Sequence, residues 1–306
     1  MDREQSASAV QEPEAPSTLG VMARGVFMGL AEVVPGVSGG TIALITGIYH
    51  HLVGALASFG PSSIGLLRDV PEFIRVHKIG FLMSLAAGMG VGILLFGNLM
   101  SYLLAEFEPL VWAFFFGVIG ASVWVIGRHR PVRYLVTFSV VGLILGLALL
   151  WLPAADGSVG PLDLFVGGAV AVCAWLLPAV SGSYMLLVMG LYQTVIDAVA
   201  TLDLATLAIV AAGCAIGLLL FAKVLAWLLK HWYEQVLALL TGFMLGSMVK
   251  LWPWQLSGAG SVYASLTTPA QYEQATAQPA MLAAAIGCAC AGAVGLWLLS
   301  TFTTQR

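Results

Sequence analysis

Charged residues are scarce in this sequence of 306 residues. Asp, Glu, Lys and Arg make up only 9% of it and hydrophobic residues 60%, and the mean hydropathy is +0.97. A soluble domain of this size could not cover its surface with so few charges. Long apolar runs instead recur to the C-terminus and predict an all-α polytopic membrane protein.

A metal-ligand pattern is also missing. The four cysteines (Cys173, Cys214, Cys288 and Cys290) lie in apolar stretches, and no set of His or Cys residues has the spacing of a zinc site. Cysteine in such surroundings is commonly a small buried hydrophobe, so we expect no metal and no cofactor. Nucleic acid is not expected as a partner either.

The N-terminal segment lacks the features of a signal peptide. Residues 1–18 are polar, acidic and rich in Pro, Ser and Ala, and no basic stretch leads into a short apolar core. We therefore expect a disordered cytoplasmic tail.

Two of the apolar regions are interrupted near their centres. "PGVSGG" interrupts residues 20–57, and "PAVSGS" interrupts residues 162–199. Each region could be one span with an unwound middle, two complete spans, or a re-entrant hairpin of two half-helices. The uninterrupted segments are each long enough to span a membrane, and they cover residues 80–104, 110–127, 132–152, 204–229, 234–251 and 278–300.

An internal repeat relates the two interruptions. Aligning Pro35 with Pro178 pairs the V-S-G of both, and the same register pairs the G-x-Y at Tyr49 with the G-x-Y at Tyr192. Each half then consists of one interrupted element followed by three spans, in residues 19–152 and 153–306. Because three is an odd number, we expect the second half to be inverted relative to the first, as in many secondary transporters.

The charges of the loops favour hairpins. If both interrupted regions are re-entrant, the basic loops at 58–79 and 128–133 fall on one side of the membrane, and the acidic loops fall on the other. The positive-inside rule then places both termini in the cytoplasm. Two complete crossings per region would give the same sides, so only the short length of the half-helices speaks against them.

The interruptions predict an anion site. Non-helical backbone at membrane depth is tolerated where protein or a water-filled cavity satisfies it, and a half-helix that begins there presents unpaired N–H groups. Glycines let this backbone approach a ligand and hydroxyls add donors, which suits phosphate or carboxylate. The alternative is that small residues only let helices pack closely. The predicted donors are Gly36, Val37, Ser38, Gly39, Gly40 and Thr41 in the first interruption, and Ser181, Gly182 and Ser183 in the second.

A few ionisable and aromatic residues accompany this site. Glu32 lies just before the first interruption and predicts a coupling or gating group, the alternative being a helix–helix ion pair or a cap. Arg24 could pair with a phosphate, or it could only snorkel to the interface. Lys223, Tyr49 and Tyr192 are secondary candidates, for which snorkelling or interfacial anchoring is the alternative.

Both motifs resemble those of a known family. "MGLAEVVPGVSGGTIALITGIY", residues 28–49, resembles the signature of the bacterial polyprenyl-phosphate translocases (PopT), and "PAVSGSYMLLVMGLY", residues 178–192, resembles their second element. The likeness extends over about residues 20–300. It implies a flippase of the bacterial cytoplasmic (inner) membrane that returns undecaprenyl phosphate from the outer to the inner leaflet. Glu32 stands where Asp is usual, and Ala179 stands where Gly is expected.

The resemblance also sets the expected partners. They are a polyprenyl phosphate, membrane lipids and a coupling proton or sodium ion, while the oligomeric state stays open. A channel or carrier for a small soluble anion could have the same site. An intramembrane lipid-phosphate phosphatase is disfavoured, because no His lies beside Ser38 or Ser181 within its motif, and we therefore expect a protein that is not an enzyme.

Overall fold

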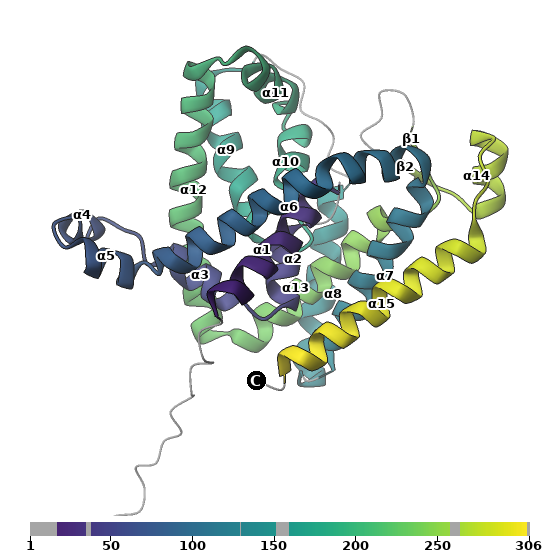
Figure 1. Cartoon of the computed structure of the whole chain (residues 1–306), viewed down its shortest axis with the longest axis horizontal. Helices are drawn as coiled ribbons and strands as arrows, with labels where there is room; N and C mark the ends of the chain where they lie inside the picture. Colours follow the sequence, from purple (N-terminus) through teal and green to yellow (C-terminus); the bar gives the residue numbers. More distant parts are fainter. Residues whose placement is uncertain (1–16, 35–37, 129, 151–158, 258–263, 305–306) are drawn as a thin grey trace, which may run out of the picture.

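The computed structural model describes residues 17–34, 38–128, 130–150, 159–257 and 264–304, and most of them are helical (Figure 1). Leu94 and Leu220, on two of the long helices, are 81% and 63% exposed, as lipid-facing side chains would be. The fold is that of a multi-pass helical membrane protein, and this confirms the predicted class. Five described segments are long and apolar enough to cross a membrane: α6 (Ile79–Glu106), α7 (Glu108–Gly127), α8 (Val132–Leu150), α12 (Leu204–His231) and α13 (Tyr233–Ser247) with the 3-10 turn η1 (Met248–Leu251).

Each interrupted region folds into three helical pieces. The first contains α1 (Thr18–Val33), α2 (Gly39–Ile45) and α3 (Tyr49–Ala57), and the second contains α9 (Pro161–Leu176), α10 (Gly182–Val188) and α11 (Tyr192–Thr201). We call the segment between α1 and α2 the first break, and the segment between α9 and α10 the second break. Beyond each break the chain bends again, by 117° between α2 and α3 and by 112° between α10 and α11.

These bends follow from one glycine in each half. Gly47 and Gly190 have φ angles of 76° and 70°, a left-handed conformation that an L side chain disfavours. The amide of Gly47 donates to Leu44, and that of Ile48 to Ala43, at 3.2 and 3.0 Å. This is the Schellman pattern that ends a helix, and Gly190 has the equivalent pair of bonds. In the sequence, G-x-Y only marks the repeat. In the structure, its glycine ends α2 in the first half and α10 in the second.

Helix pairs pack closely through glycines that the repeat relates. The helices α1 and α6 lie side by side, as do α9 and α12, α7 and α15 (Leu282–Thr304), and α8 and α13. A Cβ on Gly88 would come 2.2 Å from the Met22 carbonyl oxygen, and one on Gly213 would come 2.0 Å from that of Phe165. The alignment that pairs Pro35 with Pro178 also pairs Met22 with Phe165. Equivalent contacts support the repeat, while the inversion of the second half stays a prediction.

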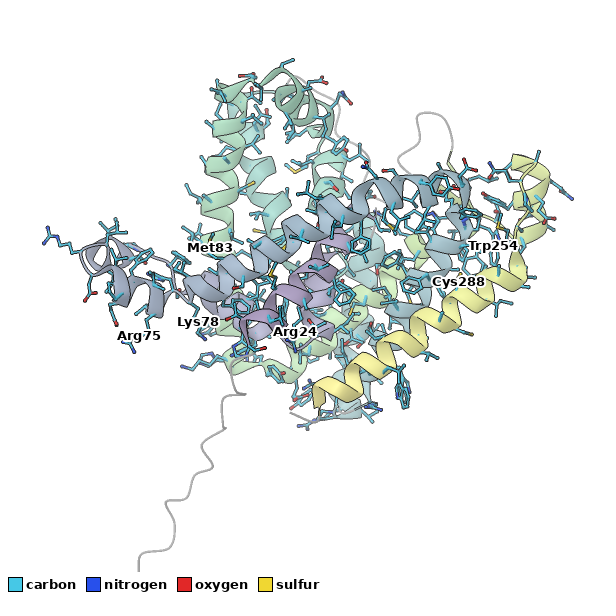
Figure 2. All side chains as sticks on the ribbon, in the orientation of Figure 1. Arg24, Arg75, Lys78, Met83, Trp254 and Cys288 are labelled. Atoms are coloured by element: carbon cyan, nitrogen blue, oxygen red, sulfur yellow. The ribbon has the colours of Figure 1, made fainter. Side chains whose placement is uncertain are left out.

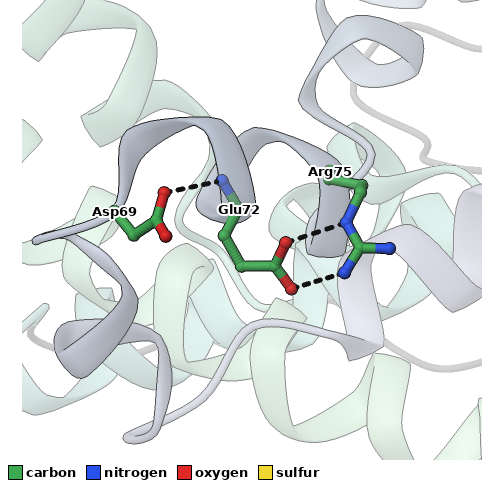
Figure 3. A network of polar contacts seen from close by, with 3 residues as sticks. All are labelled: Asp69, Glu72 and Arg75. Atoms are coloured by element: carbon green, nitrogen blue, oxygen red, sulfur yellow. Dashed lines mark hydrogen bonds and ion pairs between the residues drawn. The ribbon is translucent and has the colours of Figure 1, made fainter.

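Two connecting segments contain small elements of their own. Residues 58–79 form α4 (Ser63–Leu66) and α5 (Val70–Val76), which project from the rest of the molecule, with Arg75 far out (Figures 1 and 2). Asp69 caps α5 by accepting from the Glu72 amide, and Glu72 holds Arg75 at 2.6 and 2.8 Å (Figure 3). After η1, the strands β1 (Gln255–Ser257) and β2 (Ala264–Leu266) pair antiparallel, and α14 (Pro269–Thr276) leads towards α15.

Candidate functional site

The two breaks contact each other through side chains from the first half. The Thr41 hydroxyl oxygen, in the first turn of α2, accepts from the Ala179 amide at 2.8 Å. The buried Tyr49 hydroxyl donates to the Leu176 carbonyl oxygen at 3.0 Å. Residues 138 and 127 positions apart in the sequence are thereby joined at the two places where helices stop. The two motifs, each of which was expected to supply donors to an anion site, therefore meet in the structure.

Ser38 is the residue that both begins α2 and reaches the second break. Its hydroxyl oxygen accepts from the Gly40 amide at 3.1 Å, the N-cap bond expected of a serine before a helix. The same hydroxyl lies 3.4 Å from the Trp175 carbonyl oxygen and 3.5 Å from that of Leu177. Because Ser38 is 97% buried, its proton has protein acceptors rather than solvent.

Ser181 has the same local role in the second half. It is the N-cap of α10 and accepts from the Tyr184 amide at 3.4 Å. Its hydroxyl also lies 2.9 Å from that of Ser183, which is exposed. The second break therefore presents two linked hydroxyls, whereas Ser38 is enclosed between the breaks.

Glu32 bridges the two halves from the end of α1. Its Oε1 atom accepts from the Gly39 amide and from the Trp175 indole N–H, both at 2.8 Å. The Gly39 amide is one of the donors predicted for an external anion, so in this structure a carboxylate of the protein itself occupies it. A Cβ on Gly39 would lie 2.6 Å from this oxygen, so a larger residue would displace the Glu32 carboxylate from this position. Trp175 holds the position equivalent to Glu32 in the repeat, and the two side chains form one contact.

Close packing accounts for two other predicted glycines. A Cβ on Gly40 would lie 3.1 Å from the Leu176 carbonyl oxygen, and one on Gly182 would lie 2.5 Å from that of Ala171. Both glycines thus let the start of a half-helix lie against the backbone of α9. Close helix packing, the alternative explanation for the small residues in the motifs, is therefore observed at these two positions. Anion binding by their amides stays a prediction.

Arg24 lies away from the breaks. Its Nε atom donates to the Thr46 carbonyl oxygen at 3.2 Å and its guanidinium also donates to Gly20. Thr46 is the C-cap of α2, so this cation stabilises the negative end of that half-helix. The helix α2 has seven residues and is roughly 10 Å long, so Arg24 lies at the end opposite to its first turn.

The remaining predicted residues lie outside the contact between the breaks or outside the described residues. Lys223 is exposed on α12, with its ammonium beside Gly60, and Tyr192 is 37% exposed at the start of α11. Gly36 and Val37 are outside the described residues.

Sequence reasoning missed Lys250, a cation that does reach the second break. It lies in η1, and its Nζ atom is 2.9 Å from the ring centre of Tyr184 on α10. Ser181, Ser247 and Lys250 line one small cavity of about 20 Å³. A lysine inside the predicted span 234–251 was a usable signal, because charges within spans are rare and tend to be functional.

Comparison with known families now bears on this arrangement. Residues 28–265 match the family described as undecaprenyl phosphate translocase-like. The match includes both breaks and Lys250. The chain belongs to this family.

Curated relatives support the same assignment. A polyprenyl-phosphate transporter of Vibrio cholerae is 36% identical over 270 residues, which cover 84% of this chain and 87% of the relative. A polyprenyl-phosphate transporter of Staphylococcus aureus is 32% identical over 251 residues, covering 75% of this chain and 84% of the relative. No solved structure matches the chain. These matches confirm the family that the motifs resemble, the polyprenyl-phosphate translocases.

Proposed function

We propose that this protein is a polyprenyl-phosphate transporter that moves undecaprenyl phosphate from the outer to the inner leaflet of the bacterial cytoplasmic membrane. The observation that carries the proposal is its similarity, over most of both chains, to relatives named polyprenyl-phosphate transporters. The substrate has a lipid tail that stays in the bilayer, so only its phosphate needs a polar path. Return to the inner leaflet would recycle the carrier lipid.

The contact between the breaks supports this path. Helices that stop within the apolar part of the chain are typical of transporter binding sites. Here they bring the Ser38 and Thr41 hydroxyls, with the first-turn amides of α2, against the second break, where Ser181 caps α10. Such groups can replace the water around a phosphate. In this structure Ser38 and Thr41 bond across the contact, so the breaks have to separate before a headgroup can pass.

We assign the coupling role to Glu32. Its carboxylate holds the Gly39 amide and the Trp175 indole, so it competes with a phosphate for that amide and joins the halves. Protonation would remove the negative charge and weaken both bonds, because hydrogen bonds to an ionised acceptor are roughly twice as strong as neutral ones. A proton arriving at Glu32 would therefore favour separation of the breaks and entry of the phosphate.

A hydrolytic role is less well supported by the site. The described partners of Ser38 are backbone groups, and those of Ser181 are Ser183 and the Tyr184 amide. Neither serine has an imidazole partner among these contacts, so a base that would activate it is not in place. We therefore propose transport without phosphate cleavage.

Transport by reconstituted protein tests the proposal. Vesicles containing the protein are loaded with a labelled short-chain polyprenyl phosphate, and its movement between leaflets is measured by quenching from one side. We expect Ser38→Ala to slow movement at least about tenfold, because it removes a hydroxyl at the contact and an N-cap worth about 1 kcal/mol. Ser38→Thr should retain most of the rate.

Ser84→Ala is the matched control, since that hydroxyl bonds to the Gly80 carbonyl oxygen of its own helix, away from both breaks. Movement by Ser38→Ala at the wild-type rate would contradict the assigned path. Flux of inorganic phosphate without lipid movement would favour the small-anion carrier, and release of inorganic phosphate from the lipid would favour an enzyme.

A further inference from the structure

Lys250 is a cation in apolar surroundings at the second break. Its side chain extends from η1 to the face of the Tyr184 ring, with a distance of 2.9 Å between Nζ and the ring centre. The cavity that it lines has Leu149, Val180 and Phe243 as apolar walls, and Ser181 as a polar neighbour from the break. The cavity beside Lys250 is therefore lined by α8, by α13 with η1, and by the second break with the start of α10.

No described carboxylate pairs with this ammonium. The ion pairs of the described residues join Arg75 to Glu72 and Arg130 to Glu234, and neither includes Lys250. A ring face attracts a cation but does not neutralise it. A charge in apolar surroundings is normally paired, and within a membrane its pairing partner is commonly a functional group. An anion would therefore complement Lys250.

The groups around Lys250 fit a phosphate monoester. The Ser181 and Ser183 hydroxyls are hydrogen-bonded to each other at 2.9 Å, which uses one of their two protons and leaves the other for an acceptor. A phosphate presents several acceptor oxygens and a charge that a lysine binds as a point charge. Hydroxyls and an ammonium on adjacent elements therefore complement it in both charge and hydrogen bonding.

The ring of Tyr184 lies where the anion would have to approach. The cavity of about 20 Å³ can accommodate a water molecule but is too small for a phosphate group. Because the ring covers the ammonium, the anion would replace the ring face as the partner of Lys250. Tyr184 belongs to α10, the half-helix that follows the second break, and the Ala179 amide of that break bonds to Thr41. This exchange would therefore move a side chain close to the contact between the breaks.

We propose that Lys250, with Ser181 and Ser183, forms a recognition site for a phosphate monoester, and that the Tyr184 ring covers this site in the conformation described here. The inference deepens the proposed transport function and rests on it for the identity of the lipid. Under the predicted topology η1 lies at the outer end of its span, where a substrate from the outer leaflet would arrive.

Binding measurements on the full-length protein in nanodiscs test the site. A short-chain polyprenyl phosphate and inorganic phosphate are titrated separately against wild type, Lys250→Met, Lys250→Arg and Lys223→Met. We expect Lys250→Met to weaken binding of the polyprenyl phosphate at least tenfold, and Lys250→Arg to retain affinity within about threefold, since it keeps the charge. Lys223→Met removes an exposed lysine that the structure places away from both breaks, so its binding measures what loss of a distant positive charge alone does, and we expect a change smaller than that of Lys250→Met.

The ligand arms distinguish the source of the phosphate. Lys250-dependent binding of the polyprenyl phosphate alone identifies a lipid headgroup site, and Lys250-dependent binding of both ligands identifies a general phosphate site. Wild-type affinity of Lys250→Met for both ligands would overturn the proposal. A variant that fails to fold is recognised by its thermal unfolding, and in that case the comparison of Lys250→Gln with Lys250→Arg replaces it under the same criteria.

Transport separates this proposal from the function on which it rests. If the wild type moves the lipid and Lys250→Met binds and moves it equally well, the site fails while the transport function stands. If the wild type binds inorganic phosphate through Lys250 but moves no polyprenyl phosphate, the transport function fails while the site stands.

Discussion

At the scale of single residues, Glu32 has the most informative surroundings. One of its carboxylate oxygens holds a backbone amide of its own half and an indole of the other half. The sequence indicated a coupling group, a helix–helix ion pair or a cap, and the observed contact is with neutral donors at the start of α2. A negative charge placed at the positive end of a half-helix stabilises the contact between the breaks.

Glu32→Gln should change how transport depends on pH. The amide oxygen of Gln can still accept both hydrogen bonds, which go to one oxygen of Glu32, but the residue carries no charge and does not titrate. We expect tighter binding of polyprenyl phosphate and a transport rate that varies much less between pH 5 and pH 8 than the wild-type rate. Transport is measured in reconstituted vesicles across that range. The control is Glu72→Gln on exposed α5, and a steep pH dependence retained by Glu32→Gln would exclude the coupling role.

Lys250 shows what a single sequence does not reveal at this scale. Its occurrence within an apolar span was visible, whereas the break that it faces depends on how α13 packs against α8 and on where η1 meets Tyr184 of α10. Arg24 is the opposite case, since its place before the first motif suggested a phosphate contact and its bonds are to Thr46 and Gly20. Long side chains at helix ends have several acceptors within reach, and only the fold determines which one is used.

At the scale of elements, the breaks themselves could be predicted and the bends after them could not. Proline and glycine in an apolar run are strong local signals, so the ends of α1 and α9 were expected near their observed positions. The bends at Gly47 and Gly190 depend on a glycine that adopts the left-handed conformation after a short helix. The sequence G-x-Y alone does not indicate that conformation, because glycine and tyrosine are common in membrane helices. The helices α4 and α5 are not predicted from the sequence, in which residues 58–79 stand out only as a basic loop.

Gly190→Ala tests the bend as an element. A Cβ in the left-handed conformation costs about 1–2 kcal/mol, so the variant should unfold at a lower temperature than the wild type in the same detergent. Gly190→Asn should lose less, because Asn tolerates this conformation better. Gly54→Ala is the matched control: Gly54 lies within α3 with open space around its Cβ position, and its substitution should be neutral or stabilising. Equal stability of Gly190→Ala and Gly54→Ala would contradict the bend as described.

At the scale of the whole molecule, the repeat organises both halves. Third helices are exchanged between halves, since α15 packs along α7 and α8 packs along α13. This pairing makes each half incomplete without the other, so we expect the chain to fold as one unit rather than as two independent domains. The repeat could be read from the sequence because its register is carried by motif residues and by the glycines where helices approach closely, such as Gly88 and Gly213. The exchange of helices between the halves could not be predicted, because no motif near α8 or α15 specifies which helix each packs against.

The inverted orientation of the halves makes a distinct prediction about membrane sides. If both interrupted regions are re-entrant, the two ends of each region lie on the same side, and the two regions open to opposite sides. In a variant whose four cysteines are replaced by alanine, single cysteines are introduced at Thr18 or Arg68 for the first region and at Leu162 or Leu202 for the second. A membrane-impermeant maleimide added to intact cells should label the second pair and leave the first pair unlabelled until the membrane is opened.

Two alternative arrangements give different labelling patterns. A single crossing per region would place Thr18 and Arg68 on opposite sides, and parallel halves would place both pairs on the same side. Retained transport by the cysteine-free variant shows that the background is intact. Two complete crossings per region would label like hairpins, but α2 and α10, with seven residues each, are too short for complete crossings. With the predicted pattern, the two breaks would approach the middle of the membrane from opposite sides, and separating them in turn can expose one phosphate site first outward and then inward.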